Sequence, residues 1–218
     1  MFRAQVPSRG AHGSEVAPMD CDTNIVGHFY DKYDTKNPIE RKLTAGFLQA
    51  VSKLYEKVGP QTVLEVGCGE GILADYLLGK EPGVLMMHAC DVSLDSVRPG
   101  LDDSISFGQA SIYQLPYTDN SFELVLCCEV LEHLTLPPIG LYELCRVASR
   151  AVIVSTPWEP VWRLLNMVRG KYLQELGNTP GHIQHFTRRG LLRLIEGQLN
   201  ILHVERPLPW TVVLAEPR

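Results

Sequence analysis

One short stretch constrains the fold of this chain more than any other part of its sequence. The apolar run Thr62–Val66 predicts a buried strand, and Gly67, Gly69 and Gly71 follow it. Glycines at alternate positions let the backbone turn sharply and approach a ligand with no Cβ in the way. A helix is expected directly after them, over 71–79, with its free N–H groups directed at that ligand. The stretch therefore predicts a site for a nucleotide-like cofactor.

A carboxylate further along the chain supports a ligand that contains ribose. A second apolar run, 84–90, ends at Asp91, 20 residues after Gly71. An acidic residue at this offset, after the second strand, binds ribose hydroxyls in dinucleotide-binding folds. The dinucleotide fingerprint itself needs a glycine where this chain has Ile72, so a nicotinamide dehydrogenase is disfavoured. The alternative is a glycine turn and a surface aspartate in some other α/β protein.

The order of the apolar and amphipathic segments predicts an α/β domain. Strands are expected at 62–66, 84–90, 104–107, 122–128, 150–155, 200–204 and 210–215. Helices are expected at 24–33, 71–79, 93–99, 138–147 and 186–196, with a long helix from Pro38 to Gly59. This alternation implies a mostly parallel sheet covered by helices on both faces. Residues 1–20 lack periodicity and are expected to be disordered, whereas 21–218 are expected to form one domain.

The composition narrows the partners and the compartment. The 218 residues carry a net charge of −5, which argues against a nucleic-acid-binding surface because such surfaces are normally basic. Six cysteines without a Cys-x-x-Cys pair are typical of thiols in a reducing compartment. No apolar run is long enough for a transmembrane helix, and no hydrophobic signal segment is apparent. We therefore expect a cytoplasmic protein that acts on a small molecule.

The pattern from Glu65 to Gly71, Glu-x-Gly-x-Gly-x-Gly, resembles the first motif of class I S-adenosylmethionine-dependent methyltransferases. The resemblance implies a Rossmann-like, doubly wound sheet of seven mostly parallel strands with the last strand antiparallel, and S-adenosyl-L-methionine as cofactor. The positions that would contact the cofactor are Glu65, Gly67, Cys68, Gly69, Gly71, Asp91, Val92, Gln109, Ala110, Ser111, Cys128 and Glu129. Family members often place an N-terminal aromatic over the cofactor, so Tyr30 and Tyr33 are either lid residues or ordinary packing residues.

The segment from Glu129 to His133 offers two carboxylates and an imidazole. If it is helical, residues 129, 132 and 133 share one face, and such a set suits a divalent metal. The segment resembles the Glu-x-x-Glu-His motif of the ubiquinone-biosynthesis O-methyltransferases and of the small-RNA 2′-O-methyltransferases, in which a later histidine completes a metal site. By this resemblance, the ligands of Mg²⁺ or Zn²⁺ would be Glu129, Glu132, His133 and His182.

The metal is one of two interpretations of this segment. The small-RNA enzymes carry a second histidine directly after the first, where this chain has Leu134. Many small-molecule methyltransferases have a similar segment with no known metal, and there the first glutamate lies near the cofactor and the histidine is structural. Without a metal, His133, His182 and His185 are candidate general bases, because a neutral imidazole accepts a proton near pH 7.

Residues 157–180 are expected to form an insertion after the fifth strand. Trp162 and several aliphatic residues supply apolar surface, whereas Arg163, Arg169 and Lys171 are basic. We favour a lid over the acceptor pocket. The alternatives are an amphipathic element in peripheral contact with a membrane surface and simple packing in the core.

Taken together, the motifs predict methyl transfer from S-adenosylmethionine to a small-molecule acceptor, at a hydroxyl oxygen. Two alternatives stay open: a quinone or lipid methyltransferase at the membrane surface, and a non-catalytic module that binds the cofactor.

Overall fold

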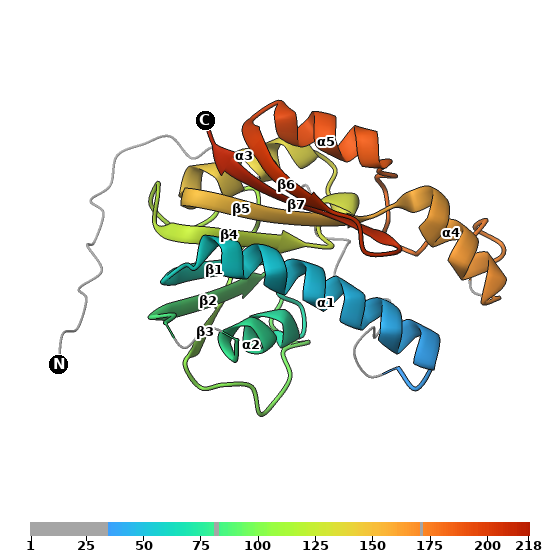
Figure 1. Cartoon of the computed structure of the whole chain (residues 1–218), viewed down its shortest axis with the longest axis horizontal. Helices are drawn as coiled ribbons and strands as arrows, with labels where there is room; N and C mark the ends of the chain where they lie inside the picture. The colour runs from blue at the N-terminus through green and yellow to red at the C-terminus, as the bar shows by residue number, and fades with distance from the viewer. Residues whose placement is uncertain (1–34, 81–82, 171) are drawn as a thin grey trace.

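The computed structural model describes residues 35–80, 83–170 and 172–218 (Figure 1). In chain order its elements are α1 (Pro38–Val58), β1 (Thr62–Val66), α2 (Ile72–Leu78), β2 (Met86–Asp91), β3 (Ile105–Gln109), β4 (Phe122–Cys128), the 3₁₀ helix η1 (Leu131–His133), α3 (Pro137–Val147), β5 (Ala148–Pro157), α4 (Glu159–Val168), α5 (Arg188–Glu196), β6 (Leu199–Glu205) and β7 (Trp210–Pro217). The disordered segment expected at 1–20 and the helix expected over 24–33, with Tyr30 and Tyr33, lie outside the described residues.

The strands form one seven-stranded sheet in the order β3-β2-β1-β4-β5-β7-β6. Strands β1 to β5 are parallel, and β7 is antiparallel to both of its neighbours. The expected fold class, a doubly wound sheet with an antiparallel last strand, is confirmed. The chain leaves β1 toward β3 on one side and returns to β4 on the other, so the order of strands reverses between β1 and β4. Ligands of open α/β sheets bind at the carboxyl ends of the strands at such a point.

Two helical layers cover the sheet because successive strand residues point to opposite faces. In β1, Val63 joins the core beneath α1 and α2, and Leu64 joins the core beneath α3 and α5. Figure 1 shows the same arrangement, with α1 and α2 on one side of the strands and α3 and α5 on the other. Both cores are apolar. The polar side chains that could bind a ligand or take part in a reaction therefore lie at the ends of the strands.

One expected helix is wrong. Residues 93–99 form turns instead, with the Val97 N–H donating to the Leu94 carbonyl. The Ser93 hydroxyl accepts the Asp95 N–H, a local bond that competes with helix formation. Pro99, near the end of the segment, cannot donate to an i−4 carbonyl. The connection from β2 to β3 is therefore an irregular loop beside the glycine turn, and the Arg98 N–H donates to the Glu70 carbonyl of that turn.

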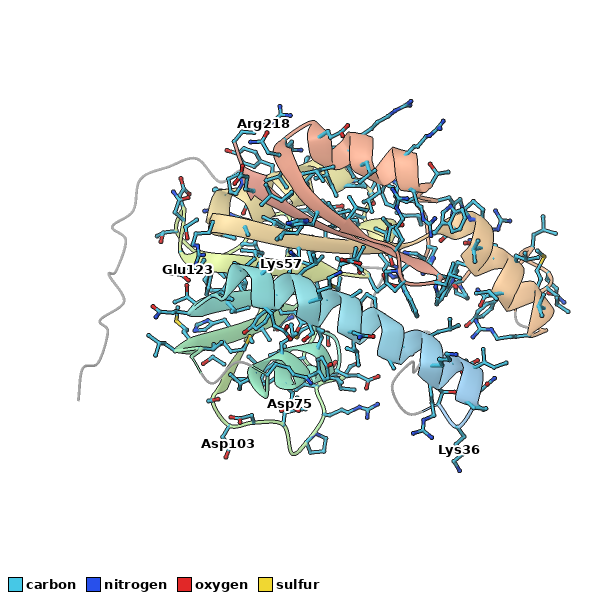
Figure 2. All side chains as sticks on the ribbon, in the orientation of Figure 1. Lys36, Lys57, Asp75, Asp103, Glu123 and Arg218 are labelled. Carbon is cyan, nitrogen blue, oxygen red and sulfur yellow. The ribbon has the colours of Figure 1, made fainter. Side chains whose placement is uncertain are left out.

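The sheet edge opposite the carboxyl ends is closed by Glu123, which Figure 2 labels near the start of β4. Its Oε2 accepts the Gln61 N–H at 2.9 Å and an Arg150 N–H at 3.0 Å. These bonds hold the beginnings of β1, β4 and β5 together, so the polar residues at this end of the strands stabilise the fold.

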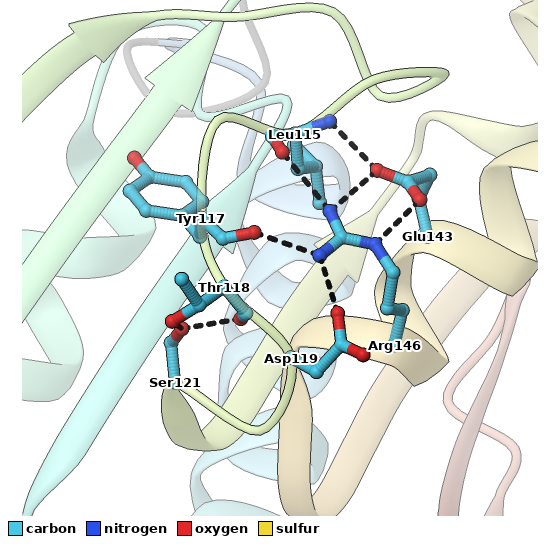
Figure 3. Close-up of polar contacts among 7 residues, drawn as sticks. All are labelled: Leu115, Tyr117, Thr118, Asp119, Ser121, Glu143 and Arg146. Atoms are coloured by element: carbon cyan, nitrogen blue, oxygen red, sulfur yellow. Dashed lines mark hydrogen bonds and ion pairs between the residues drawn. The ribbon is translucent and has the colours of Figure 1, made fainter. Parts of the chain in front are cut away.

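Arg146 on α3 holds the loop between β3 and β4, as Figure 3 shows. Its Nε and Nη2 donate to the two carboxylate oxygens of Glu143 at 2.7 and 2.8 Å. The guanidinium also donates to the carbonyls of Leu115 and Tyr117 and to the carboxylate of Asp119. The Leu115 N–H in turn donates to Glu143, at 2.8 Å. One partly buried ion pair therefore organises a loop that has little regular structure of its own.

The Glu143 carboxylate should stabilise the fold in a pH-dependent way. The hydrogen bond from Arg146 holds the pKa of Glu143 below its usual value. A lowered pKa in the folded state means that the stabilisation is present above the ordinary glutamate pKa and is lost as the pH falls through the folded value. Glu143→Gln should lower the free energy of unfolding by about 2–3 kcal/mol at pH 7, the scale of a hydrogen bond to a charged group.

Urea unfolding of the wild type and of Glu143→Gln at pH 7 and at about pH 3.5 measures this contribution. The difference between the two proteins should shrink at the lower pH. An equal loss of stability at both values would contradict the role of the ionised carboxylate.

Candidate functional site

The candidate site lies at the carboxyl ends of the parallel strands, where loops from four strands meet. Pairing in register brings these ends level: Val66 opposes Cys90, Asp91 opposes Gln109, and Cys128 opposes Ser155. Most of the residues that the sequence pointed to follow these strand ends. The sheet therefore brings distant motifs to one edge.

The glycine turn after β1 has the backbone conformation that its glycines allow. Gly67, Gly69 and Gly71 have φ angles of 78°, 51° and 78°, in the region that side chains disfavour. The N–H groups of Gly67 and Cys68 donate to the Cys90 carbonyl at 2.7 and 3.0 Å, which fixes the turn against β2.

Two of these glycines are also required by contacts within the protein. A Cβ on Gly67 would lie 2.2 Å from Cγ2 of Val130, and a Cβ on Gly71 would lie 2.7 Å from Cδ1 of Leu101. The turn is thus pressed against the segment after β4 on one side and against the β2–β3 loop on the other. The sequence suggested only that the glycines admit a ligand, and it contained no signal for these contacts.

Asp91 lies at the end of β2 and faces the glycine turn. Its Oδ2 accepts the Gly69 N–H at 2.8 Å. An ionised carboxylate accepts several hydrogen bonds, so this contact leaves capacity for the hydroxyl protons of a sugar. The structure brings the two motifs that the sequence paired, the glycines and the aspartate, into direct contact.

The thiols beside the turn are buried. Burial raises the pKa of Cys68 well above its ordinary value, and the nearby carboxylates of Glu65 and Asp91 raise it further. The pKa of Cys90 is raised to about 12 for the same reasons. Glu65 on β1 is 3% exposed and Cys128 at the end of β4 is 8% exposed. The cysteines that the structure describes are all free thiols.

The third strand end joins the loops after β2 and β3. The Gln109 side-chain amide donates to the carbonyl of Val92 at 2.7 Å, and the Ala110 N–H donates to the carbonyl of Asp91 at 2.8 Å. The Ser111 hydroxyl accepts the Tyr113 N–H at 3.3 Å. Gln109 and Ser111 therefore already make local bonds, and contact of either residue with the cofactor stays a prediction.

The segment after β4 is not the helix that would place its two glutamates on one face. Glu129 has a φ of 63°, and only Leu131–His133 form a 3₁₀ turn. The Glu129 carboxylate turns instead to the Ser155 hydroxyl at 3.1 Å and to Nε1 of Trp210 at 2.6 Å. The expected ligand set is corrected accordingly: Glu129 is not in the cluster of potential metal ligands.

Glu132, His133 and His182 do come together. One potential ligand atom from each residue lies within 4.8 Å of the others. The rings of His133 and His182 meet edge to face, with centroids 4.9 Å apart. The N–H groups of Ile183 and Gln184 donate to the Glu132 carbonyl, which anchors the later loop to the 3₁₀ turn. The structure thus unites three of the four expected ligands from two distant segments.

Each of the two histidines makes a hydrogen bond through Nδ1. In His133 it lies 2.9 Å from the Gly181 carbonyl, and in His182 it lies 2.8 Å from Oε1 of Glu159. In His182 the bond to Glu159 occupies Nδ1, so Nε2 is the nitrogen that can make other contacts. His185 is 43% exposed in its side chain, and its Nδ1 is 3.9 Å from Oε2 of Glu159. Of the three candidate bases, His185 is therefore the one outside the cluster.

The insertion is built into the site. Trp162 of α4 is 7% exposed, and its Nε1 donates to the Thr179 hydroxyl at 2.8 Å. Its ring stacks on the His182 ring, with the centroids 6.3 Å apart. It also lies 5.7 Å from Trp210, the partner of Glu129. Trp162 therefore packs beside His182 in the interior. It is not an exposed lid residue over an acceptor pocket.

The basic residues of the insertion that the structure describes are used internally. Arg169 pairs with Glu40 of α1 at 2.8 Å, and Nε of Arg163 donates to the Leu176 carbonyl at 3.1 Å. The exposed apolar side chains of this region are Leu164, Met167, Val168, Leu173 and Leu176. Within 35–80, 83–170 and 172–218, no helix combines the length and apolar character needed to cross a membrane.

Three residues that contact the candidate site escaped the sequence analysis: Glu159, Ser155 and Trp210. Glu159 is in the first turn of a helix, where an acidic residue is ordinary. It lies 23 positions from His182, and no periodic pattern links the two. Trp210 begins the last strand, where an aromatic residue is unremarkable. Only the folded chain connects these residues to the motifs.

Comparison with known proteins gives a consistent result. Residues 64–154 match the methyltransferase domain family. A demethylmenaquinone methyltransferase from Porphyromonas gingivalis is 30% identical over 128 residues, which span 51% of this chain and 52% of that protein. Methyltransferase GfsG from Streptomyces halstedii is 33% identical over 164 residues, 63% of this chain and 59% of that protein. The chain thus spans little more than half the length of these two relatives.

A solved structure shares the fold. Magnesium protoporphyrin IX methyltransferase from Synechocystis PCC 6803 superposes with a TM-score of 0.61 at 16% identity, over 84% of this chain and 89% of that one. The matched sequence segment, 64–154, includes the glycine turn, Asp91 and His133 but ends before Glu159 and His182. The second half of the histidine cluster therefore belongs to the part of the chain that the family match does not cover.

The contact between the glycine turn and the segment after β4 can be tested through stability. Gly67→Ala should lower the free energy of unfolding by about 2–4 kcal/mol, because a side chain at φ 78° is strained and its Cβ overlaps Val130. Val130→Ala should recover part of this loss in the double variant. Gly46→Ala is the matched control: no atom lies within 4 Å of its Cβ, and it should stabilise α1 by about 0.5–1 kcal/mol.

Urea unfolding of the wild type, Gly67→Ala, Val130→Ala and the double variant gives the coupling energy in a double-mutant cycle. Losses for Gly67→Ala and Val130→Ala that simply add would show that the two residues are not in contact.

Proposed function

We propose that this chain is a class I S-adenosylmethionine-dependent methyltransferase that transfers the cofactor's methyl group to a hydroxyl oxygen of a small molecule. The observation that carries the acceptor proposal is the cluster of Glu132, His133 and His182 in the loops after β4 and α4. It is joined to the proposed cofactor loop through Val130, which packs on Gly67. Cofactor and acceptor are thereby assigned to adjacent parts of one sheet edge.

The cofactor half of the site consists of the glycine turn and Asp91. S-adenosylmethionine, when bound, supplies a methyl group activated by the sulfonium. Asp91 would accept the ribose hydroxyls while keeping the Gly69 N–H. The remaining proposed contacts are Glu65, Gly67, Cys68, Gly71, Val92, Gln109, Ala110, Ser111, Cys128 and Glu129. Glu129 is suited to a polar end of the cofactor, because Trp210 and Ser155 hold its carboxylate in place.

The acceptor half fits a divalent metal by its donor chemistry. One carboxylate and two imidazoles are common ligands for Zn²⁺ and for other first-row divalent ions. Both imidazoles make a hydrogen bond through Nδ1, which turns their Nε2 atoms to other partners, as in known metal sites. Glu132 and His182 are 1% and 7% exposed, so the set is largely shielded from water. A divalent ion held there would lower the pKa of an acceptor hydroxyl and orient it.

The protein's own contribution to the reaction is mainly alignment. Methyl transfer is an in-line displacement, so its rate depends on holding the acceptor oxygen and the methyl carbon in line and near contact. The buried wall of Trp162 and Trp210 stands beside His182 and Glu129 and limits the entry of water. If no metal takes part, the Nε2 atom of His133 or His182 is the base that removes the hydroxyl proton.

A quinone or lipid acceptor at a membrane surface is the second candidate. It is favoured by the exposed Leu164, Val168, Leu173 and Leu176 on α4 and the following turns. The internal use of Arg163 and Arg169 weakens the electrostatic part of this hypothesis. Its test is whether turnover depends on added anionic vesicles.

The cofactor assignment predicts a selective loss of affinity. Asp91→Ala removes the acceptor of the ribose hydroxyls and should weaken binding of S-adenosylhomocysteine by about 1.5–3 kcal/mol. Asp95→Ala, an exposed aspartate on the same loop, is the matched control and should bind normally. Calorimetric titration measures both variants. Unchanged affinity in Asp91→Ala would refute the assignment.

The acceptor assignment predicts metal dependence. Methyl transfer from labelled S-adenosylmethionine to the small-molecule fraction of a cell extract, followed by mass spectrometry, should stop with EDTA. It should return when Mg²⁺, Mn²⁺ or Zn²⁺ is added in excess. His182→Ala should abolish the restored activity, whereas His185→Ala, outside the cluster, should keep most of it. Full activity in excess EDTA would eliminate the metal and leave His133 or His182 as the base.

A further inference from the structure

Glu159 is a buried carboxylate that the proposed reaction does not yet use. It is the first residue of α4 and is 3% exposed. Its Oε1 lies 2.8 Å from Nδ1 of His182, and its Oε2 is 3.9 Å from Nδ1 of His185. Oε2 makes no hydrogen bond within the described part of the chain. Burying a carboxylate is costly, so a carboxylate that contacts mainly histidines calls for a role.

We propose that Glu159 is a positioning residue: it holds His182 in the tautomer and orientation in which Nε2 can bind a divalent metal beside Glu132 and His133. This inference rests on the metal site proposed above. It adds a residue outside the Glu-x-x-Glu-His segment and outside the part of the chain that matches the methyltransferase domain family.

The hydrogen bond determines the tautomer. A carboxylate can only accept, so Nδ1 of His182 carries the hydrogen in the bond to Glu159. In a neutral imidazole the other nitrogen, Nε2, then has a free lone pair, which is the form that binds a metal. A hydrogen-bonded carboxylate also makes the imidazole a better ligand. His133 has the same arrangement, with the Gly181 carbonyl as the acceptor.

The surroundings leave the His182 ring little freedom. Trp162 lies nearly parallel to it, with an interplanar angle of 21°. Trp162 is itself fixed by its bond to the Thr179 hydroxyl. The Glu159 N–H donates to the Phe186 carbonyl at 3.1 Å, so α4 and the histidine loop are tied together by backbone as well as by side chain. The contacts of Trp162 and Glu159 therefore fix both the plane of the His182 ring and its tautomer.

Glu159→Gln tests the role with little change of shape. The amide can present its NH₂ group to Nδ1, which favours the opposite tautomer, with hydrogen on Nε2 and no lone pair for a metal. Mn²⁺ binding, measured by calorimetry on the full chain, should weaken about 10–100-fold, the usual effect of losing such a supporting partner. Glu159→Asp keeps the carboxylate and should bind more tightly than Glu159→Gln.

The matched control is Glu143→Gln, which removes a buried carboxylate from the other side of the sheet. It should lose stability and bind Mn²⁺ as the wild type does. A second readout needs no metal: ¹⁵N NMR of labelled histidine should show the His182 hydrogen on Nδ1 in the wild type and on Nε2 in a large fraction of Glu159→Gln.

Three results would overturn the inference, and each points to a different error. Wild-type affinity for Mn²⁺ in Glu159→Gln would show that Glu159 does not position the ligand. No Mn²⁺ binding by the wild type would remove the proposed metal site and the inference with it. A wild-type His182 with its hydrogen on Nε2 would refute the tautomer, and this measurement decides even if Glu159→Gln fails to fold.

Discussion

The close packing of Gly67 against Val130 is the constraint on which the rest of the site depends. At 2.2 Å, a Cβ on this glycine could not fit beside the valine. The contact joins the turn after β1 to the segment after β4, across the point where the order of strands reverses. Because both segments leave the sheet here, the glycine motif and the Glu-x-x-Glu-His motif share one wall. A substitution in the glycine turn should therefore shift the segment after β4, and the reverse, since packed interiors deform little.

The parts of the fold that could be predicted are those with strong periodicity. Buried parallel strands such as 122–128 read as continuous apolar runs, and the helix that begins at Pro38 has both an apolar face and clear end signals. A helix was expected over 93–99 from the alternation of strands and helices, and the structure shows turns there. The local hydrogen bond of Ser93 and the missing N–H of Pro99 favour turns over a helix in this segment.

Within the candidate site, the sequence brought together residues that belong to recognisable motifs and missed those that only the fold brings near. Asp91 was placed correctly because a fixed offset from the glycine turn reflects a βαβ unit. Glu129, which the resemblance included among the metal ligands, lies outside the cluster of Glu132, His133 and His182, because it has positive φ and the segment is not helical there. Glu159 and Trp210 had no local signal, since their partners are 23 and 81 positions away.

The raised pKa of Cys68 and Cys90 has a consequence for the durability of the protein. S-adenosylmethionine is an alkylating agent, and the nucleophile that such agents attack is the thiolate, not the thiol. Cys68 lies in the loop proposed to hold this cofactor, where an ionised sulfur would be open to methylation by the bound cofactor. Burial and the carboxylates of Glu65 and Asp91 keep that sulfur protonated. The negative charges proposed to bind the cofactor thus also protect the Cys68 sulfur from methylation by that cofactor.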